Sequence, residues 1–141
     1  MLKLLVPIEE NETRADFLRA LCKWLKRVET PVELHLIHVQ PAMPREVGMF
    51  ISQENMNDYQ REEGMKQLEP AMAQLKEAEI PFLLHIFVGV PADIILRFAE
   101  QKGIHQIVMG HQPAHSIANL FQSSVSSKVL QAAEIPVMLI R

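Results

Sequence analysis

The chain has 141 residues, enough for a single domain over residues 1–141 that buries about 68% of its unfolded surface without disulfides or metals. Its formal net charge of −3 excludes the basic surface that nucleic acid or an anionic membrane requires, and no apolar run approaches the roughly 18 residues of a membrane span. The single cysteine, Cys22, excludes an internal disulfide and favours a reducing compartment, so we expect a cytoplasmic protein with neither nucleic acid nor membrane among its partners.

Five short segments have the composition of β-strands, and the spacing of apolar residues between them is helical. The predicted strands are Leu2–Ile8, Val32–Val39, Phe82–Val88, His105–Met109 and Pro136–Ile140. The predicted helices are Arg14–Val28, about Gln53–Ala78, Asp93–Gln101 and Ser124–Ala133. Because a helix follows every strand except the last, we predict an α/β fold: an open five-stranded parallel sheet with helices on both faces.

Two residues inside the predicted helices have structural interpretations. Cys22 lies at helical spacing with Phe17, Leu18 and Leu25, which indicates a small buried hydrophobic side chain. Pro70 falls within the long helix and should bend or split it, because proline removes one hydrogen bond and crowds the preceding turn.

The segment from Ile107 to Val125 is the strongest candidate for ligand binding. A strand ends in Gly110, a polar loop follows, and the serines of 123–127 open an apolar helix. Free backbone N–H groups and hydroxyls at the start of a helix are typical of phosphate sites in α/β proteins. Because such folds bind ligands outside the carboxyl ends of their strands, we expect any ligand to lie against the segments that follow the first four strands.

Five separated motifs, in the same order along the chain, resemble those of the universal stress protein family. They are Leu5-Val6-Pro7-Ile8 with an acidic residue after it, Gly89-x-Pro91-Ala92, Ile107-Val108-Met109-Gly110, Ser124-Val125-Ser126 and the terminal Ile135–Arg141. The resemblance covers essentially the whole chain. It implies a three-layer sandwich of the adenine nucleotide alpha hydrolase-like type, usually a homodimer, in a family with members that bind ATP and members that do not.

The ATP-binding members carry glycine, two residues, glycine, nine residues, then glycine and a serine or threonine. On this chain the first of these positions holds Gly110, but the next two hold Pro113 and Ser123. Proline has no N–H and a φ fixed near about −65°, so Pro113 can neither donate to a phosphate nor adopt a positive φ. Ser123 adds a Cβ where the backbone must approach the phosphates. The motif is therefore degenerate and predicts weak ATP binding.

Acidic residues after the first strand also predict weak ATP binding. Glu9 stands where the nucleotide-binding pattern usually has aspartate, and Glu10 and Glu12 follow it closely. Uncompensated carboxylates about 6 Å from a phosphate cost on the order of 3 kcal/mol per charge pair at an effective dielectric near 20. A triphosphate would need Mg²⁺ or Lys128 to offset this cost. Alternatively, these carboxylates form a solvated first helical turn, and Ser123–Ser127 only cap a helix.

Two functional hypotheses follow from this resemblance. In the first, the chain is a cytoplasmic regulatory homodimer that acts on a protein partner without ATP or another cofactor, and it is not an enzyme. In the second, it binds ATP with Mg²⁺, or AMP, and has weak ATPase or autophosphorylation activity. The ligand contacts would then be Pro7, Glu9, Val39, Gly110, Ser123, Ser124 and Val125.

The histidines give no catalytic or metal site from sequence alone. His38, His111 and His115 could meet at one sheet edge and hold zinc, but no pattern shows that they converge, and no metal site is predicted. The other three are predicted to be strand residues without partners: His35, His85 and His105. No catalytic triad or pair of acid and base carboxylates can be assembled, so no catalytic residue is predicted.

The last strand is the predicted dimer interface. In the strand order of the family it lies at a sheet edge, and its residues Val137, Met138, Leu139 and Ile140 are all apolar. An exposed apolar edge is a liability unless another chain covers it. We therefore expect a two-fold homodimer in which this strand packs or pairs with its copy.

Overall fold

A computed structural model of the chain describes residues 1–9, 14–41, 53–110 and 124–140. Its strands are β1 (Leu2–Pro7), β2 (Val32–Gln40), β3 (Leu83–Val88), β4 (Gln106–Gly110) and β5 (Val137–Ile140). Its helices are α1 (Arg14–Leu25), α3 (Gln53–Glu77), α4 (Pro91–Gln101) and α5 (Ser124–Ala132). The predicted α/β fold class and the order of the elements are confirmed, with boundaries displaced by at most a few residues.

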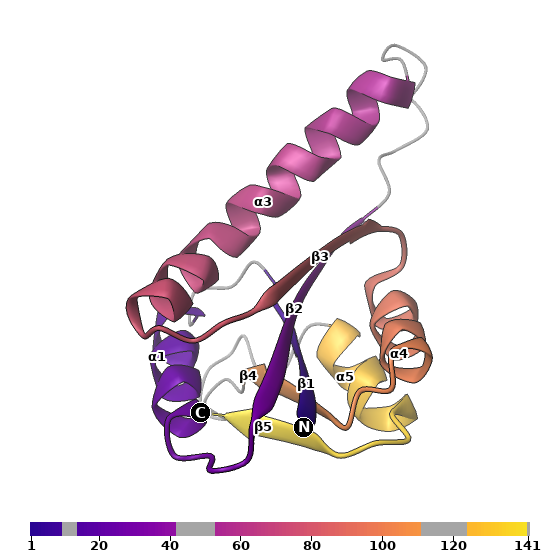
Figure 1. The fold of residues 1–141 in the computed structure, drawn as a ribbon. Coiled ribbons are helices and arrows are strands. Elements are labelled where there is room, and N and C mark those ends of the chain that lie inside the picture. The colour runs from indigo at the N-terminus through magenta and orange to yellow at the C-terminus, as the bar shows by residue number, and fades with distance from the viewer. Residues whose placement is uncertain (10–13, 42–52, 111–123, 141) are drawn as a thin grey trace, which may run out of the picture.

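The strands form one parallel five-stranded sheet in the order β3-β2-β1-β4-β5 (Figure 1). The chain adds β2 and β3 on one side of β1 and then crosses to the other side for β4 and β5. The strand order therefore reverses between β1 and β4, and a ligand crevice is expected beside the carboxyl ends of these strands. The predicted position of the last strand at a sheet edge is confirmed.

Helices cover both faces of the sheet. On one face α1 and α3 pack over Leu4 and Val6, and on the other face α4 and α5 pack over Leu5 (Figure 1). All three of these β1 side chains are fully buried. Because successive side chains of a strand point to opposite faces, a central strand covered on both sides must be apolar at every position. This requirement explains the nearly unbroken apolar run at the start of the sequence.

Cys22 is buried in the apolar layer beneath α1, as the helical spacing predicted. Its burial raises the pKa of the thiol, which keeps the group protonated and unreactive.

Pro70 does not split the long helix, because α3 continues without a break from Gln53 to Glu77. The alternative, a bend at Pro70, stays a prediction. The neighbours Leu68, Ala71 and Leu75 are all fully buried against the sheet. Tertiary packing of this apolar face therefore holds the helix together across the lost hydrogen bond.

The chain passes from β3 into α4 through Gly89 and Val90. Proline stands in the first turn of α4, where its missing N–H has no helical partner to lose. The helix therefore begins at Pro91, slightly before the predicted Asp93. Within the described part of the chain, no helix combines the length and the apolar character that a membrane span needs.

Candidate ligand-binding site

A pocket of about 240 Å³ opens at the carboxyl ends of β1 and β2. Side chains of α3, α4 and α5 complete its walls. Its described lining residues are Pro7, Ile8, Glu9, Ile37, His38, Val39, Gln40, Pro41, Gln67, Pro91, Ile95 and Val125. The pocket shares β1 with the reversal of strand order, but it lies on the β2 side of that strand, and none of its described lining residues belongs to β4.

The pocket brings together predicted ligand contacts from three separate segments of the sequence. Pro7, Glu9, Val39 and Val125 all line it, as expected for contacts to one ligand. Gly110 ends β4 and is not among the lining residues. Ser123 and the side chain of Ser124 lie outside the described residues. The ligand contacts assigned to all of these positions stay predictions.

Packing against α1 explains why position 110 holds a glycine, without any contact to phosphate. A Cβ at this position would lie 3.1 Å from Cγ and 3.2 Å from Cδ2 of Phe17 on α1. A side chain there would force the Phe17 ring to move within a packed core. The glycine at the end of β4 therefore lets α1 approach the sheet closely, and its presence alone does not indicate a nucleotide site.

The electrostatics of the pocket do not favour a highly charged ligand. Most of its described lining residues are apolar, and none of those lining residues is a lysine or an arginine. Glu9, half-buried at the end of β1, brings a negative charge to it. Apolar walls with a few polar groups are typical of pockets for flat, largely uncharged ring systems.

His38 is a buried polar side chain of the pocket, 7% exposed. Its Nδ1 lies 2.7 Å from the carbonyl oxygen of Ile8, and because a carbonyl can only accept, Nδ1 carries the proton. Among the residues that the structure describes, no three potential ligands gather to hold a metal ion. The positions of His111 and His115 lie outside the described residues, so their convergence with His38 is not tested.

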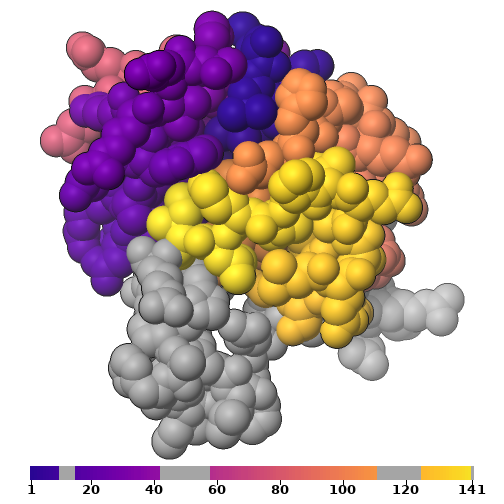
Figure 2. Space-filling model, turned by 90° about the horizontal axis from the view of Figure 1, so that it is seen from below, coloured from indigo at the N-terminus to yellow at the C-terminus, as the bar shows by residue number. Residues whose placement is uncertain are grey.

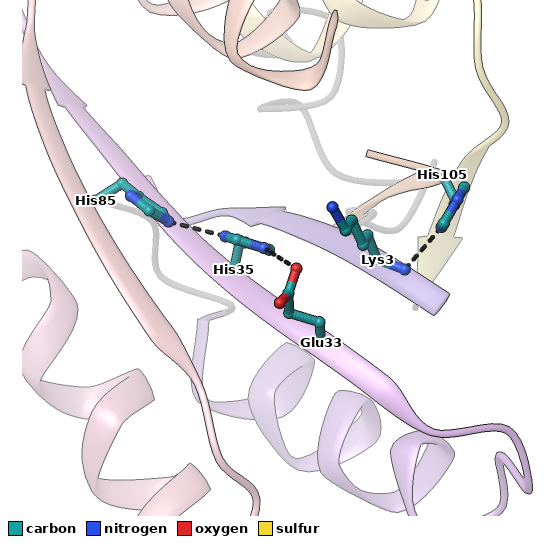
Figure 3. Close-up of polar contacts among 5 residues, drawn as sticks. All are labelled: Lys3, Glu33, His35, His85 and His105. Carbon is teal, nitrogen blue, oxygen red and sulfur yellow. Dashed lines mark hydrogen bonds and ion pairs between the residues drawn. The ribbon is translucent and has the colours of Figure 1, made fainter. Parts of the chain in front are cut away.

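The prediction that His35, His85 and His105 have no partners is wrong (Figure 3). His35 Nδ1 lies 2.8 Å from His85 Nε2, and His35 Nε2 lies 3.0 Å from a carboxylate oxygen of Glu33. The backbone N–H of Lys3 donates to His105 Nδ1 over 2.9 Å. The bond between His35 and His85 joins β2 to β3, and the bond between Lys3 and His105 joins β1 to the residue before β4. Both depend on register, which alternation within one strand does not reveal.

The contacts of His35 define a directed chain of hydrogen bonds. The carboxylate of Glu33 accepts from Nε2–H of His35, and this bond lowers the pKa of Glu33. When His35 is neutral, its Nδ1 is then the acceptor for Nε2–H of His85. Burial, including the ring of Phe98 at a centroid distance of 4.5 Å, lowers the pKa of His85, and the nearby His35 and Lys102 lower it further.

We expect His85→Phe to reduce the loss of stability in acid. The lowered pKa means that the unfolded chain binds more protons than the folded chain as the pH falls. The stability that neutral His85 contributes is thus fully present above about pH 6.5, the pKa of histidine in the unfolded chain. It is lost as the pH falls through the lower pKa of His85 in the folded chain. Urea unfolding at pH 7.5 and pH 5.0 should show a smaller decline for the variant than for the parent. An equal decline in the parent and in His85→Phe would contradict this assignment.

Gln67 and Ile95 line the pocket but were not found by sequence reasoning. Gln67 lies inside α3 and Ile95 inside α4. The spacing of apolar residues along each helix predicts only which face of that helix packs on the sheet. Their place at the pocket depends on how far α3 and α4 extend along the sheet, a tertiary property for which the sequence carries no local signal. Pro91 was marked by the glycine and proline of the turn that precedes α4.

A parallel sheet with a reversed strand order and helices on both faces defines a doubly wound α/β protein, and the pocket lies at its strand ends, where this class of fold has its ligand sites. The model of the universal stress protein family matches residues 1–141, and the chain belongs to this family. It is 29% identical to the universal stress protein YxiE of Bacillus subtilis, over 99% of this chain and 98% of that protein.

Solved structures agree with this fold. The structure of MJ0577 of Methanocaldococcus jannaschii has a TM-score of 0.75 at 23% identity, over 98% of this chain and 94% of that chain. The universal stress protein of Archaeoglobus fulgidus in complex with dAMP has a TM-score of 0.66 at 20% identity, over 100% and 98% of the two chains. Likeness at these identities shows the shared fold.

Proposed function

We propose that this universal stress protein is a binding protein whose pocket takes the nucleoside part of an adenine nucleoside monophosphate. The lining of the pocket is the observation that carries the proposal. Val39, Ile95 and Val125 supply apolar surface for a planar base, and Glu9 supplies an acceptor for ribose hydroxyls. The complex of the Archaeoglobus fulgidus relative with dAMP supports a ligand of this class on the same fold.

In this proposal the phosphates contribute little to binding. Two of the three glycine positions of the motif hold Pro113 and Ser123, which removes one N–H donor and adds a Cβ. The described lining residues include no lysine or arginine, while Glu9 is negative. The β- and γ-phosphates of ATP would therefore add charge without gaining matching donors. Regulation by bound ligand, and not turnover of ATP, is the function that we propose.

Calorimetric titration with AMP, ATP and ATP with Mg²⁺ tests this function. We expect AMP to bind and ATP to bind no more tightly, with or without the metal. Ribose 5-phosphate, which has no base, is the control ligand and should give no measurable heat. Absence of AMP binding at millimolar concentration would overturn the proposed ligand class. ATP binding ten times tighter than AMP binding would favour the alternative, a member with weak ATPase or autophosphorylation activity.

We further propose that the chain acts as a homodimer through β5. This strand is at an edge of the sheet, and Leu139 on it is 40% exposed. Figure 2 shows the yellow C-terminal segment at the surface of the molecule. A second copy related by a two-fold axis would cover both the unpaired backbone groups and the apolar side chains. A protein partner and a cytoplasmic location remain predictions from the family resemblance and the lone cysteine.

We expect Leu139→Lys to convert the dimer to monomer at micromolar concentration. The change removes apolar contact at the edge and places two like charges near the two-fold axis. Sedimentation velocity measures the outcome. Leu83→Lys, at a 48% exposed position on the opposite edge strand β3, is the matched control and should leave the dimer intact. A parent protein that sediments only as a monomer would contradict the β5 interface.

A further inference from the structure

The backbone pairing of β1 with β2 is extended at the pocket by a side chain. The last pair in register is Pro7 with Ile37, and the N–H of Ile8 still donates to the carbonyl of Ile37 over 2.9 Å. The carbonyl of Ile8 then accepts from Nδ1–H of His38 at 2.7 Å. One imidazole on β2 therefore holds the residue at which the chain leaves β1.

The imidazole that makes this bond is itself held in place. His38 is almost fully buried, and α3 passes close to it at Gly64. A Cβ at Gly64 would lie 2.7 Å from Cγ2 of Ile86 and 3.5 Å from Cδ2 of His38. With helix and strand this close, the ring has little room to change rotamer. The carbonyl of Ile8 thus bonds to a donor whose position the core determines.

Glu9 follows Ile8 directly and lines the pocket. The peptide unit between them is planar, so the bond that fixes the carbonyl oxygen of Ile8 also fixes the N–H and the Cα of Glu9. We infer that His38 is a positioning residue that directs the carboxylate of Glu9 toward the ribose hydroxyls of a bound nucleotide. This inference rests on the proposed function and adds the residue on which recognition of the sugar depends.

The geometry of the sugar contact makes such positioning effective. Hydrogen bonds from hydroxyls to carboxylates are short, about 2.5–2.7 Å, and weaken steeply when the angle departs from linearity. A bond to a charged group contributes roughly ten- to hundredfold in affinity. If the Ile8 carbonyl is free to rotate, the Glu9 side chain moves with the peptide unit and most of this factor is lost, while contacts to the base are kept.

Two ligands and two variants test the inference. Calorimetry compares AMP with 2′,3′-dideoxy-AMP, which lacks both hydroxyls, in the parent, in His38→Met and in His38→Asn. Methionine fills similar space without a donor, whereas the asparagine amide nitrogen is as many bonds from the backbone as Nδ1. We expect the parent and His38→Asn to prefer AMP about tenfold or more. In His38→Met the preference should fall to within about twofold.

Results that contradict the proposed function differ from results that contradict only the role of His38. A parent protein that binds neither ligand overturns the proposed function and this inference with it. A parent that binds both ligands equally leaves the base contacts intact but overturns the role of Glu9 and His38. An undiminished preference in His38→Met, or an equal loss of both ligands, overturns the inference alone. If His38→Met does not fold, His38→Thr, whose hydroxyl is too short to reach Ile8, must show the same loss of preference.

Discussion

Replacing Pro113 and Ser123 together by glycine (P113G/S123G) should tighten the binding of ATP by roughly tenfold or more. The first change restores a backbone N–H that proline lacks, and the second removes a Cβ from the path of the phosphates. A hydrogen bond to a charged group contributes about 1.5–3 kcal/mol, which corresponds to this factor. Calorimetric titration with ATP and Mg²⁺ measures this gain in affinity. The affinity for adenosine, which has no phosphate, should not change.

Single variants identify which obstacle is larger. Pro113→Ala restores the N–H without the freedom to adopt a positive φ, so its gain should be smaller than that of Pro113→Gly. Unchanged weak ATP binding in P113G/S123G would show that the glycine positions are not the obstacle. The carboxylates of Glu9, Glu10 and Glu12 would then be the cause, through repulsion of the phosphates.

Leu68→Ala should lower the free energy of unfolding by about 2–5 kcal/mol. Leu68 lies on the inner face of α3, fully buried in the apolar layer between α1, α3 and the sheet. Truncation removes several buried methyl and methylene groups and leaves a cavity that a closely packed layer cannot fill. The measurement is urea unfolding followed by circular dichroism.

The matched control for this change is Leu130→Ala on α5, where the side chain is 41% exposed. Leu130→Ala removes the same atoms, but much less of the removed surface is buried. It should lower the free energy of unfolding by well under half as much as Leu68→Ala does. Equal effects of the two changes would contradict the burial of α3 against the sheet. Because Gln67 of the pocket is adjacent to Leu68, the nucleotide affinity of Leu68→Ala also reports whether α3 holds its place.

The fold could be predicted because its main determinants are local. The apolar run that became β1, the alternation of strands with helices, and the glycine and proline before α4 each carry a short-range signal. The edge position of the last strand came from the family resemblance, and the general rule for open sheets placed the candidate site at the strand ends. Pro7, Glu9, Val39 and Val125 were found in this way.

The features that sequence reasoning missed depend on contacts between segments far apart in the chain. Gln67 reaches the pocket because α3 packs against β2. The bond between His35 and His85 exists because β2 and β3 align in one particular register. Whether Pro70 splits α3 could not be decided for the same reason, because the packing that stabilises the helix across it belongs to the tertiary structure.

The central place of β1 affects how the chain folds during synthesis. Of these five strands β1 leaves the ribosome first, yet one of its edges stays unpaired until β4 emerges, and the bonded residues Lys3 and His105 are 102 positions apart. At about 5–20 residues per second, translation of that interval takes roughly 5–20 s. Throughout this time the growing polypeptide presents an apolar strand edge to other nascent chains, which is the kind of surface that chaperones bind.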